Sequence, residues 1–169
     1  MKEIPIKQLK TDVVAYAQID DEDFDKIAAR KWTLTNMGYV QSTNNGTRLH
    51  RLIMGITNPK IGIDHIDHNK LNCQRSNLRI CNQSQNGGNR IKNSINNGKP
   101  LSSKYKGVYW NKEKRKWGVS VKFQKNRIFL GYYPIEEQAA LAYNSCAKKK
   151  FGEFALLNVI EEKENPWFG

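Results

Sequence analysis

The chain is 169 residues long, and its 28 Lys and Arg outnumber 16 Asp and Glu to give a formal net charge of +12. This length allows one medium domain or two small ones, and so large a positive excess indicates a polyanionic partner, with nucleic acid as the first candidate. No apolar run approaches the ~20 residues of a membrane-spanning helix and no signal-peptide pattern opens the sequence, so we expect an intracellular, cytoplasmic protein with no membrane partner.

The first elements in the chain are expected to be a strand and a short helix. Residues 13–19 (VVAYAQI) are rich in β-forming side chains. Acids crowd residues 20–25, at the start of a helix that should run to about Arg30, where they suit the positive end of the helix dipole. This cluster could be mistaken for a metal site, and we interpret it as a solvated helix start.

A hairpin and a second group of short elements follow. Residues 38–43 and 47–51 flank Asn-Asn-Gly, which predicts an antiparallel hairpin whose turn needs positive φ. Residues 61–66 and 78–81 are then expected to be strands separated by a polar loop, and a polar, Asn-rich helix is expected at about 82–92. The order of this group is strand, strand, helix.

A linker and a third group of elements complete the chain. Residues 92–104 (KNSINNGKPLSSK) lose apolar periodicity, as expected of an exposed linker at a domain boundary. Residues 105–110, 117–123 and 127–133 are expected to be strands, and residues 135–150 carry Ala and Leu at helical spacing with acids first and lysines last. We expect three strands packed on one helix.

Candidate catalytic residues gather around the predicted strand at 61–66. Asp64 and His65 lie near its end, Asn77 follows His65 by twelve residues and Asn86 follows Asn77 by nine. Nine of the 29 residues from 69 to 97 are Asn, so the spacing alone is weak evidence for a site. The specific evidence comes from the flanking sequence motifs, which are LHRLI at 49–53, DHID at 64–67 and SNLR at 76–79.

Over residues 12–91 the pattern resembles the HNH endonuclease family, in the phage- and intron-associated branch where Asp-His, Asn and Asn replace His-Asn-His. The resemblance implies that His65 is the general base, that Asp64 and Asn86 hold a metal ion through oxygen, and that Asn77 stays off the metal and holds the loop and His65 in place. Oxygen ligands with one charge suit Mg²⁺, or Mn²⁺, and we expect neither a structural zinc nor a small-molecule cofactor.

Several residues near this site have open interpretations. Asn82 and Asn89 compete with Asn86 as the metal ligand, and only the nine-residue offset favours Asn86. His50 either touches DNA or is a packed histidine at the start of a helix, and it is left out of the core site. His68 replaces the Gly usual in this family after Asp67 and has no assigned role. Three widely spaced cysteines, at positions 73, 81 and 146, predict reduced thiols.

The positive charge is concentrated after the predicted nuclease region, since residues 90–130 hold 12 basic residues against one acid. Residues 103–158 resemble the APETALA2 (ethylene-response-factor) DNA-binding domain, in words that include YKGV at 105–108, LG at 130–131 and LN at 157–158. The resemblance implies that one sheet face enters the major groove. The residues expected to contact DNA are Lys106, Trp110, Arg115, Trp117, Lys122 and Arg127.

Two residues depart from that family. Lys106 stands where Arg is usual, and Phe129 stands where plant members have Trp. An ammonium lacks the guanidinium fork, so bidentate reading of guanine at position 106 is in doubt. The aromatic residues of the sheet could also be core residues, with the lysines forming a solvated face.

Together the elements predict an α+β protein. We expect a ββα-metal nuclease domain with an N-terminal strand, helix and hairpin extension at residues 1–91, and a linker at 92–104. A three-stranded antiparallel sheet packed on one helix should occupy residues 105–158, followed by a tail at 159–169.

The predicted function is metal-dependent cleavage of duplex DNA, and the resemblance implies a homing or mobile-element role, 3′-hydroxyl and 5′-phosphate products, and a phage or bacterial setting. One active site per chain favours a nickase. The alternatives are a sequence-specific DNA-binding regulator on an inactive HNH scaffold and a nuclease that acts on RNA.

Overall fold

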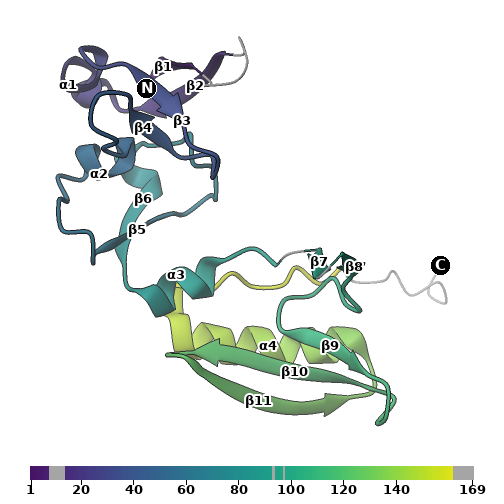
Figure 1. Ribbon diagram of the computed structural model, residues 1–169. Helices are drawn as coiled ribbons and strands as arrows, with labels where there is room; N and C mark the ends of the chain where they lie inside the picture. The colour runs from purple at the N-terminus through teal and green to yellow at the C-terminus, as the bar shows by residue number, and fades with distance from the viewer. Residues whose placement is uncertain (8–13, 93, 97, 162–169) are drawn as a thin grey trace, which may run out of the picture. The chain divides into compact units, whose positions relative to one another are not determined.

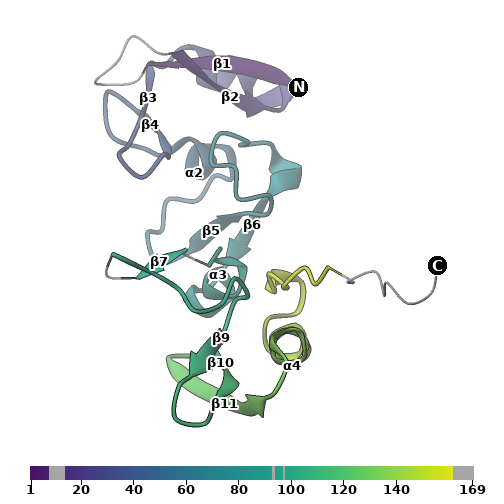
Figure 2. The ribbon, with the colours of Figure 1, turned by 90° about the vertical axis from the view of Figure 1, so that its right-hand side faces the viewer.

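The computed structural model describes residues 1–7, 14–92, 94–96 and 98–161, and shows an α+β protein. Contacts divide the chain into two compact units, Met1–Asn82 and Gln83–Gly169. Each unit has its own sheets and helices, which are labelled in Figure 1 and seen from another side in Figure 2. No helix within the described ranges is long and apolar enough to cross a membrane.

The first unit is built on a four-stranded sheet with strand order β2-β1-β3-β4. Strand β1 (Lys2–Lys7) pairs antiparallel with β2 (Val14–Ile19), which was the strand expected at 13–19, although residue 13 lies outside the described residues. Strand β3 (Trp32–Leu34) runs parallel to β1 and antiparallel to β4 (Val40–Ser42). Alternation along β1 buries Ile4 and Ile6 on one face.

The acidic segment after β2 forms a helix that is shorter and less solvated than expected. A 3₁₀ turn, η1 (Asp21–Asp23), leads into helix α1 (Phe24–Ala28). Asp23 is buried and accepts hydrogen bonds from the Nε and Nη2 atoms of Arg75 at 3.0 and 2.8 Å. The interpretation of the whole cluster as a solvated helix start is therefore wrong at Asp23, because a basic partner 52 residues later in the chain compensates its burial.

The expected hairpin at 38–51 is correct at its turn and wrong in its second arm. Gly46 has φ +68° at the tight turn, and Gln41 and Arg48 form an isolated antiparallel bridge. Residues 49–53 then form helix α2 (Leu49–Ile53) in place of a strand. Leu49 and Ile53 lie four residues apart, so a helix places both on the same buried face, whereas a strand would also place the charged Arg51 on that face, between them.

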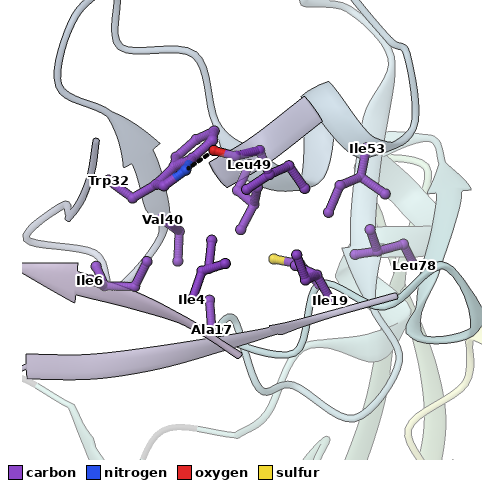
Figure 3. Close-up of a cluster of buried hydrophobic side chains, with 11 residues drawn as sticks. Ile4, Ile6, Ala17, Ile19, Trp32, Val40, Leu49, Ile53 and Leu78 are labelled. Atoms are coloured by element: carbon purple, nitrogen blue, oxygen red, sulfur yellow. Dashed lines mark hydrogen bonds between the residues drawn. The ribbon is translucent and has the colours of Figure 1, made fainter. Parts of the chain in front are cut away.

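A single hydrophobic core joins the sheet of the first unit to α2 (Figure 3). The buried indole of Trp32 donates a hydrogen bond from Nε1 to the carbonyl oxygen of Ile27 at 3.1 Å, which satisfies the polar group of this large side chain. Leu78, at the start of β6 (Leu78–Cys81), also belongs to the core. The core side chains labelled in Figure 3 are Ile4, Ile6, Ala17, Ile19, Trp32, Val40, Leu49, Ile53 and Leu78.

Two short strands end the first unit, as expected from the sequence. Strand β5 (Gly62–His65) pairs antiparallel with β6 (Leu78–Cys81), and the polar loop between them ends in the 3₁₀ turn η2 (Arg75–Asn77). Because Leu78 is anchored in the core, this hairpin has a fixed position against the rest of the unit. The register of the β5–β6 pairing determines which side chains lie opposite each other at the candidate site.

The second unit contains the expected three-stranded antiparallel sheet packed on one helix, with strand order β11-β10-β9. Val119, Val121, Ala139 and Ala140 are buried between the sheet and α4. The elements of the second unit, in chain order, are α3 (Gln83–Asn89), β7 (Ile95–Asn96), β8 (Lys99–Pro100), β9 (Val108–Asn111), β10 (Lys116–Phe123), β11 (Asn126–Tyr133), α4 (Glu136–Phe151) and η3 (Gly152–Phe154).

The division by contacts falls before α3, about ten residues earlier than the boundary expected at 92–104. The reason is that α3 and the segment after it pack within the second unit. The Nζ atom of Lys92 donates hydrogen bonds to the carbonyl oxygens of Ser103, Tyr105 and Val108 at 2.7, 2.5 and 3.2 Å, and Ser103 is buried. Part of the expected linker is thus held by the half-buried ammonium group of Lys92.

Two residues in the words YKGV and LN hold the backbone of this unit. Gly107 has φ +79°, and a Cβ atom there would lie 2.1 Å from Cδ2 of Tyr143. The side chain of Asn158 binds both backbone groups of Lys106. Its Oδ1 atom accepts from the N–H of Lys106 at 2.6 Å, and its Nδ2 atom donates to the carbonyl oxygen of Lys106 at 3.1 Å. These positions therefore have structural reasons for their residue types.

Candidate functional site

Asp64 and His65 are the last two residues of β5 and are almost completely buried, with exposed fractions of 8% and 5%. The β5–β6 register places Arg79 opposite Asp64. Arg79 donates hydrogen bonds from Nε and Nη2 to Oδ2 of Asp64, at 3.0 and 2.9 Å. The carboxylate is thus fixed in orientation by a cation on the neighbouring strand.

Arg79 was not among the residues expected in the site. The sequence held a signal for it, since strands at 61–66 and 78–81 joined by one loop pair antiparallel, and Asp64 and Arg79 are cross-strand partners in that pairing. The word SNLR at 76–79 was noted only for its family resemblance. Its Arg is an electrostatic partner of the candidate metal ligand.

His65 lies in a cluster of three rings. Its ring centroid is 5.2 Å from that of His50, in an edge-to-face arrangement, and 6.2 Å from that of Tyr39. The Sγ atom of Cys73 lies 3.9 Å from Nε2 of His65. Burial lowers the pKa of His65, although Asp67 and Asp64 act in the opposite direction. The imidazole is therefore neutral near pH 7, which is the state that accepts a proton.

His50 is packed against His65 and has an exposed fraction of 4%. Burial, followed by the nearby His65, lowers the pKa of His50 to about 3. Tyr39 contacts both histidine rings and carries two cations over its own ring, with Arg48 Cζ at 4.8 Å and Lys70 Nζ at 4.5 Å from the centroid. The geometry matches the packed interpretation of His50 and adds Tyr39, which sequence reasoning missed.

Asn77 is buried and organises the loop that follows His65. Its Nδ2 atom donates to Oδ1 of Asp67 and to the carbonyl oxygen of Asn72, both at 2.8 Å, and its Oδ1 atom accepts from the N–H of Asp67 at 3.0 Å. His68 has φ +65° in this loop, a conformation that glycine adopts without cost. The usual Gly after Asp67 thus has a backbone explanation.

We expect Asn77→Ala to lower the free energy of unfolding by about 2 kcal/mol, because it removes the hydrogen bonds that this buried side chain makes to Asp67 and Asn72. Cleavage should fall by about 10-fold or more, as is typical when a residue behind a metal site is removed. Urea denaturation and a cleavage time course measure the two effects. Asn126→Ala, at the exposed start of β11, is the matched control. Equal effects of both variants would contradict a role for Asn77 in this loop.

Asn86 lies on α3, in the second unit, and its side chain is exposed. Of its two competitors, Asn89 is buried with an exposed fraction of 5%, and Asn82 is the exposed residue before α3. An exposed amide oxygen is open to a metal ion that also carries water, so exposure favours Asn86 over Asn89. Asp64 and Asn86 belong to different units, and their pairing rests on the sequence pattern.

The donor set fits a hard cation. A carboxylate and an amide oxygen leave several positions for water and phosphate, as Mg²⁺ prefers. Within the described ranges, no three His, Cys, Asp or Glu side chains gather as they would around a zinc ion.

Cys73, Cys81 and Cys146 are free thiols, the first two of them buried, and burial raises the pKa of Cys73 to about 12.

The six residues expected to contact DNA do not share one face of the sheet. Trp110 and Trp117 are cross-strand partners with ring centroids 5.0 Å apart, and alternation places them on the side of Val108 and Val119, which faces α4. Lys122 and Arg127 are cross-strand partners on the opposite, outer face. Arg115 has φ +48° in the turn between β9 and β10.

Lys106 points inward. Its Nζ atom donates to the carbonyl oxygen of Gly88 at 2.6 Å, and burial, followed by the nearby Arg90, lowers its pKa to about 8. The ammonium group of Lys106 therefore makes this hydrogen bond within the second unit.

The outer face of the sheet carries aromatic rings beside its cations, with Phe129 exposed and Tyr109 and Tyr132 partly exposed. The ring centroids of Phe129 and Tyr132 lie 4.9 Å apart, and Lys114 Nζ lies 5.5 Å from the centroid of Tyr132. Tyr109 covers Gly118, where an added Cβ would lie 2.5 Å from Cζ of the Tyr109 ring. Flat rings and ammonium groups together suit sugars, bases and phosphates. Sequence reasoning missed Tyr109 and Tyr132, which both lie opposite Gly118, and Tyr132 reaches this face only because the β10–β11 register shifts between Val119 and Ser120.

Comparison with known proteins supplies two matches. The family model described as HNH endonuclease matches residues 48–87, which include Asp64, His65, Asn77 and Asn86. An uncharacterized HNH endonuclease of Acanthamoeba polyphaga mimivirus is 38% identical over 154 residues, which cover 86% of this chain and 76% of that protein. No solved structure matches.

Proposed function

Because the chain belongs to the HNH endonuclease family, we propose that it hydrolyses phosphodiester bonds in duplex DNA, with a divalent metal ion held by Asp64 and Asn86. An HNH endonuclease acts on nucleic acid, and enzymes of this family use a divalent metal. The observation that carries the proposal is the buried Asp64–His65 pair at the end of β5, with Arg79 on the carboxylate and a neutral imidazole beside it.

Mg²⁺ is the ion that we propose, with Mn²⁺ as a substitute. When bound, it neutralises charge on the phosphate and on the leaving oxygen. Asp64 supplies the anionic ligand, and its contact with Arg79 holds the carboxylate in one orientation. Asn86 supplies a neutral oxygen from an exposed side chain.

His65 acts as the general base. It takes a proton from the attacking water, which requires a neutral imidazole, and burial among Tyr39, His50 and Cys73 keeps it neutral. Asn77 takes no part in proton transfer. It holds the loop that begins next to His65 through its contacts with Asp67 and Asn72, and so limits the movement of the base.

The second unit binds DNA, as its resemblance to the APETALA2 domain implies. Lys122 and Arg127 lie together on the outer face and suit two phosphates or a base edge, with Phe129 as a stacking surface. Arg115, in a turn at the end of the sheet, suits a phosphate. Trp110 and Trp117 support the sheet from the α4 side. A base contact by Lys106 would require its ammonium to leave Gly88.

A homing or mobile-element role and single-strand nicking complete the proposal, since one active site per chain makes one cut the simplest outcome. The rival function is a DNA-binding regulator with an inactive first unit. The complete set of Asp64, His65 and Asn77, with Arg79 in place, favours the nuclease.

The substrate class is tested by incubating the purified protein with a labelled duplex DNA and a structured RNA of matched sequence, each with Mg²⁺ and with EDTA. The test set includes DNA from the source organism, so that a recognition site is represented. We expect cleavage of duplex DNA only, and only with Mg²⁺. Exclusive cleavage of RNA would overturn the homing role. Tight, salt-sensitive DNA binding without any cleavage would favour the regulator.

Arg127→Ala is expected to weaken DNA binding and to lower the slope of log affinity against log salt by about one unit, because one phosphate contact is lost. Binding is measured by fluorescence anisotropy in EDTA across several salt concentrations. Lys148→Ala, an exposed cation near the end of α4, is the control and should leave the slope unchanged. An unchanged slope in Arg127→Ala would remove this residue from the interface.

A further inference from the structure

Helix α3 carries the proposed metal ligand and is weak by itself. It has seven residues, QSQNGGN, of which two are Gly. Gly destabilises a helix relative to Ala, and isolated helices shorter than about 12 residues are marginal in water. The position of Asn86 therefore depends on what holds α3 from outside.

Hydrogen bonds and a packing contact within the second unit hold this helix. At its first turn, Oγ of Ser84 accepts from the N–H of Gln124 at 3.2 Å. At its end, the carbonyl oxygen of Gly88 accepts from Nζ of Lys106 at 2.6 Å and from the N–H of Leu156 at 3.1 Å. Gly88 also lies directly against Phe151, since a Cβ at position 88 would be 2.6 Å from its Cγ.

The contact from Lys106 brings a positive charge to the end of α3. A cation at the last carbonyls of a helix satisfies an orphan acceptor and complements the negative end of the helix dipole. The backbone around Lys106 is itself fixed, because Nζ of Lys92 donates to the carbonyls of Tyr105 and Val108, and Asn158 binds both backbone groups of Lys106. The ammonium of Lys106 thus extends from a rigid base to the end of α3.

We propose that Lys106 is a positioning residue for the metal site, whose ammonium fixes the end of α3 and thereby the exposed side chain of Asn86. Asn86 and Gly88 are two residues apart, about 200° around the helix, so that Gly88 packs on Phe151 while Asn86 faces away from that contact. The inference rests on the proposed function, in which Asn86 binds metal. It replaces the expected role of Lys106 as a DNA contact.

The test compares Lys106→Met, which keeps the aliphatic stem and removes the ammonium, with Lys122→Met on the outer face. The full chain is titrated with Mn²⁺, and free Mn²⁺ is followed by electron paramagnetic resonance without substrate. DNA affinity and its salt slope are measured separately in EDTA. Gly88→Ala, which pushes α3 away from Phe151, provides a second variant that keeps every charge.

We expect Lys106→Met and Gly88→Ala to raise the dissociation constant of Mn²⁺ by about tenfold, with DNA affinity and salt slope unchanged. Lys122→Met should lower the salt slope by about one unit and leave Mn²⁺ binding unchanged. Retained DNA binding shows that the variants are folded. If Lys106→Met lowers the salt slope and leaves Mn²⁺ binding unchanged, Lys106 is a DNA contact and the inference is overturned. If the unaltered chain binds no Mn²⁺, the proposed metal site itself fails.

Discussion

His65→Ala is expected to slow the single-turnover cleavage of a cognate DNA duplex by 10²- to 10⁴-fold, the range typical of a positioned general base. The side chain is buried in a ring cluster in the first unit, and the proposed DNA-binding face lies on the sheet of the second. DNA affinity in EDTA should therefore stay within about twofold of the unaltered protein, as expected for independent sites. Quenched-flow or manual time courses with end-labelled duplex measure the rate constant.

The control for this variant is His68→Gly, which removes another histidine three residues later. Its φ of +65° suits glycine, and no role in the reaction is assigned to it, so cleavage should be nearly unchanged. Equal loss of cleavage and of DNA affinity in His65→Ala would contradict the assignment of cleavage to the first unit and of DNA binding to the second. Full activity in His65→Ala would remove His65 as the base.

Gly107→Ala is expected to lower the free energy of unfolding of the second unit by about 3 kcal/mol or more, through left-handed backbone strain and a clash in the core. The added Cβ would lie 2.1 Å from Cδ2 of Tyr143 and 2.7 Å from the carbonyl oxygen of Ser120. The sheet and α4 cannot both keep their positions. DNA binding should be lost as the outer face is distorted, and urea denaturation followed by tryptophan fluorescence measures the stability.

Gly98→Ala separates the two causes. Gly98 has nearly the same φ, +75° against +79° at Gly107, but an added Cβ meets nothing within 4 Å. We therefore expect a loss of about 1 kcal/mol, from backbone strain alone, with DNA binding retained. A similar loss in both variants would show that contact with Tyr143 adds little.

The sequence predicted the elements whose pattern is local. Alternation and turn residues were enough for β2, β5, β6 and the three-stranded sheet, and the charge order predicted α4. Residues 47–51 were misassigned because a five-residue helix is too short to show helical periodicity. Strand β3 was missed because three residues cannot show an alternating pattern, and its pairing with β1 is a long-range contact.

Residue types and flanking motifs proposed Asp64, His65, Asn77 and Asn86 for the candidate site, and the first three lie in the first unit. Arg79 and Tyr39 were missed because their contacts depend on strand register and on packing between distant segments. The sheet faces were assigned from composition rather than from strict alternation, so Trp110 and Trp117 were grouped with Lys122 and Arg127. The inward direction of Lys106 depends on α3, which the sequence assigned to the other domain.

We propose that His65 is the general base of this endonuclease and that its cleavage of DNA requires a divalent metal ion. The most direct measurement is incubation of supercoiled plasmid carrying DNA of the source organism with the purified protein, with Mg²⁺ or EDTA and beside His65→Ala. We predict open-circle product that requires Mg²⁺ and is lost in His65→Ala, with linear product only if two cuts are paired. Equal product from His65→Ala, or product that persists in EDTA, would contradict the account.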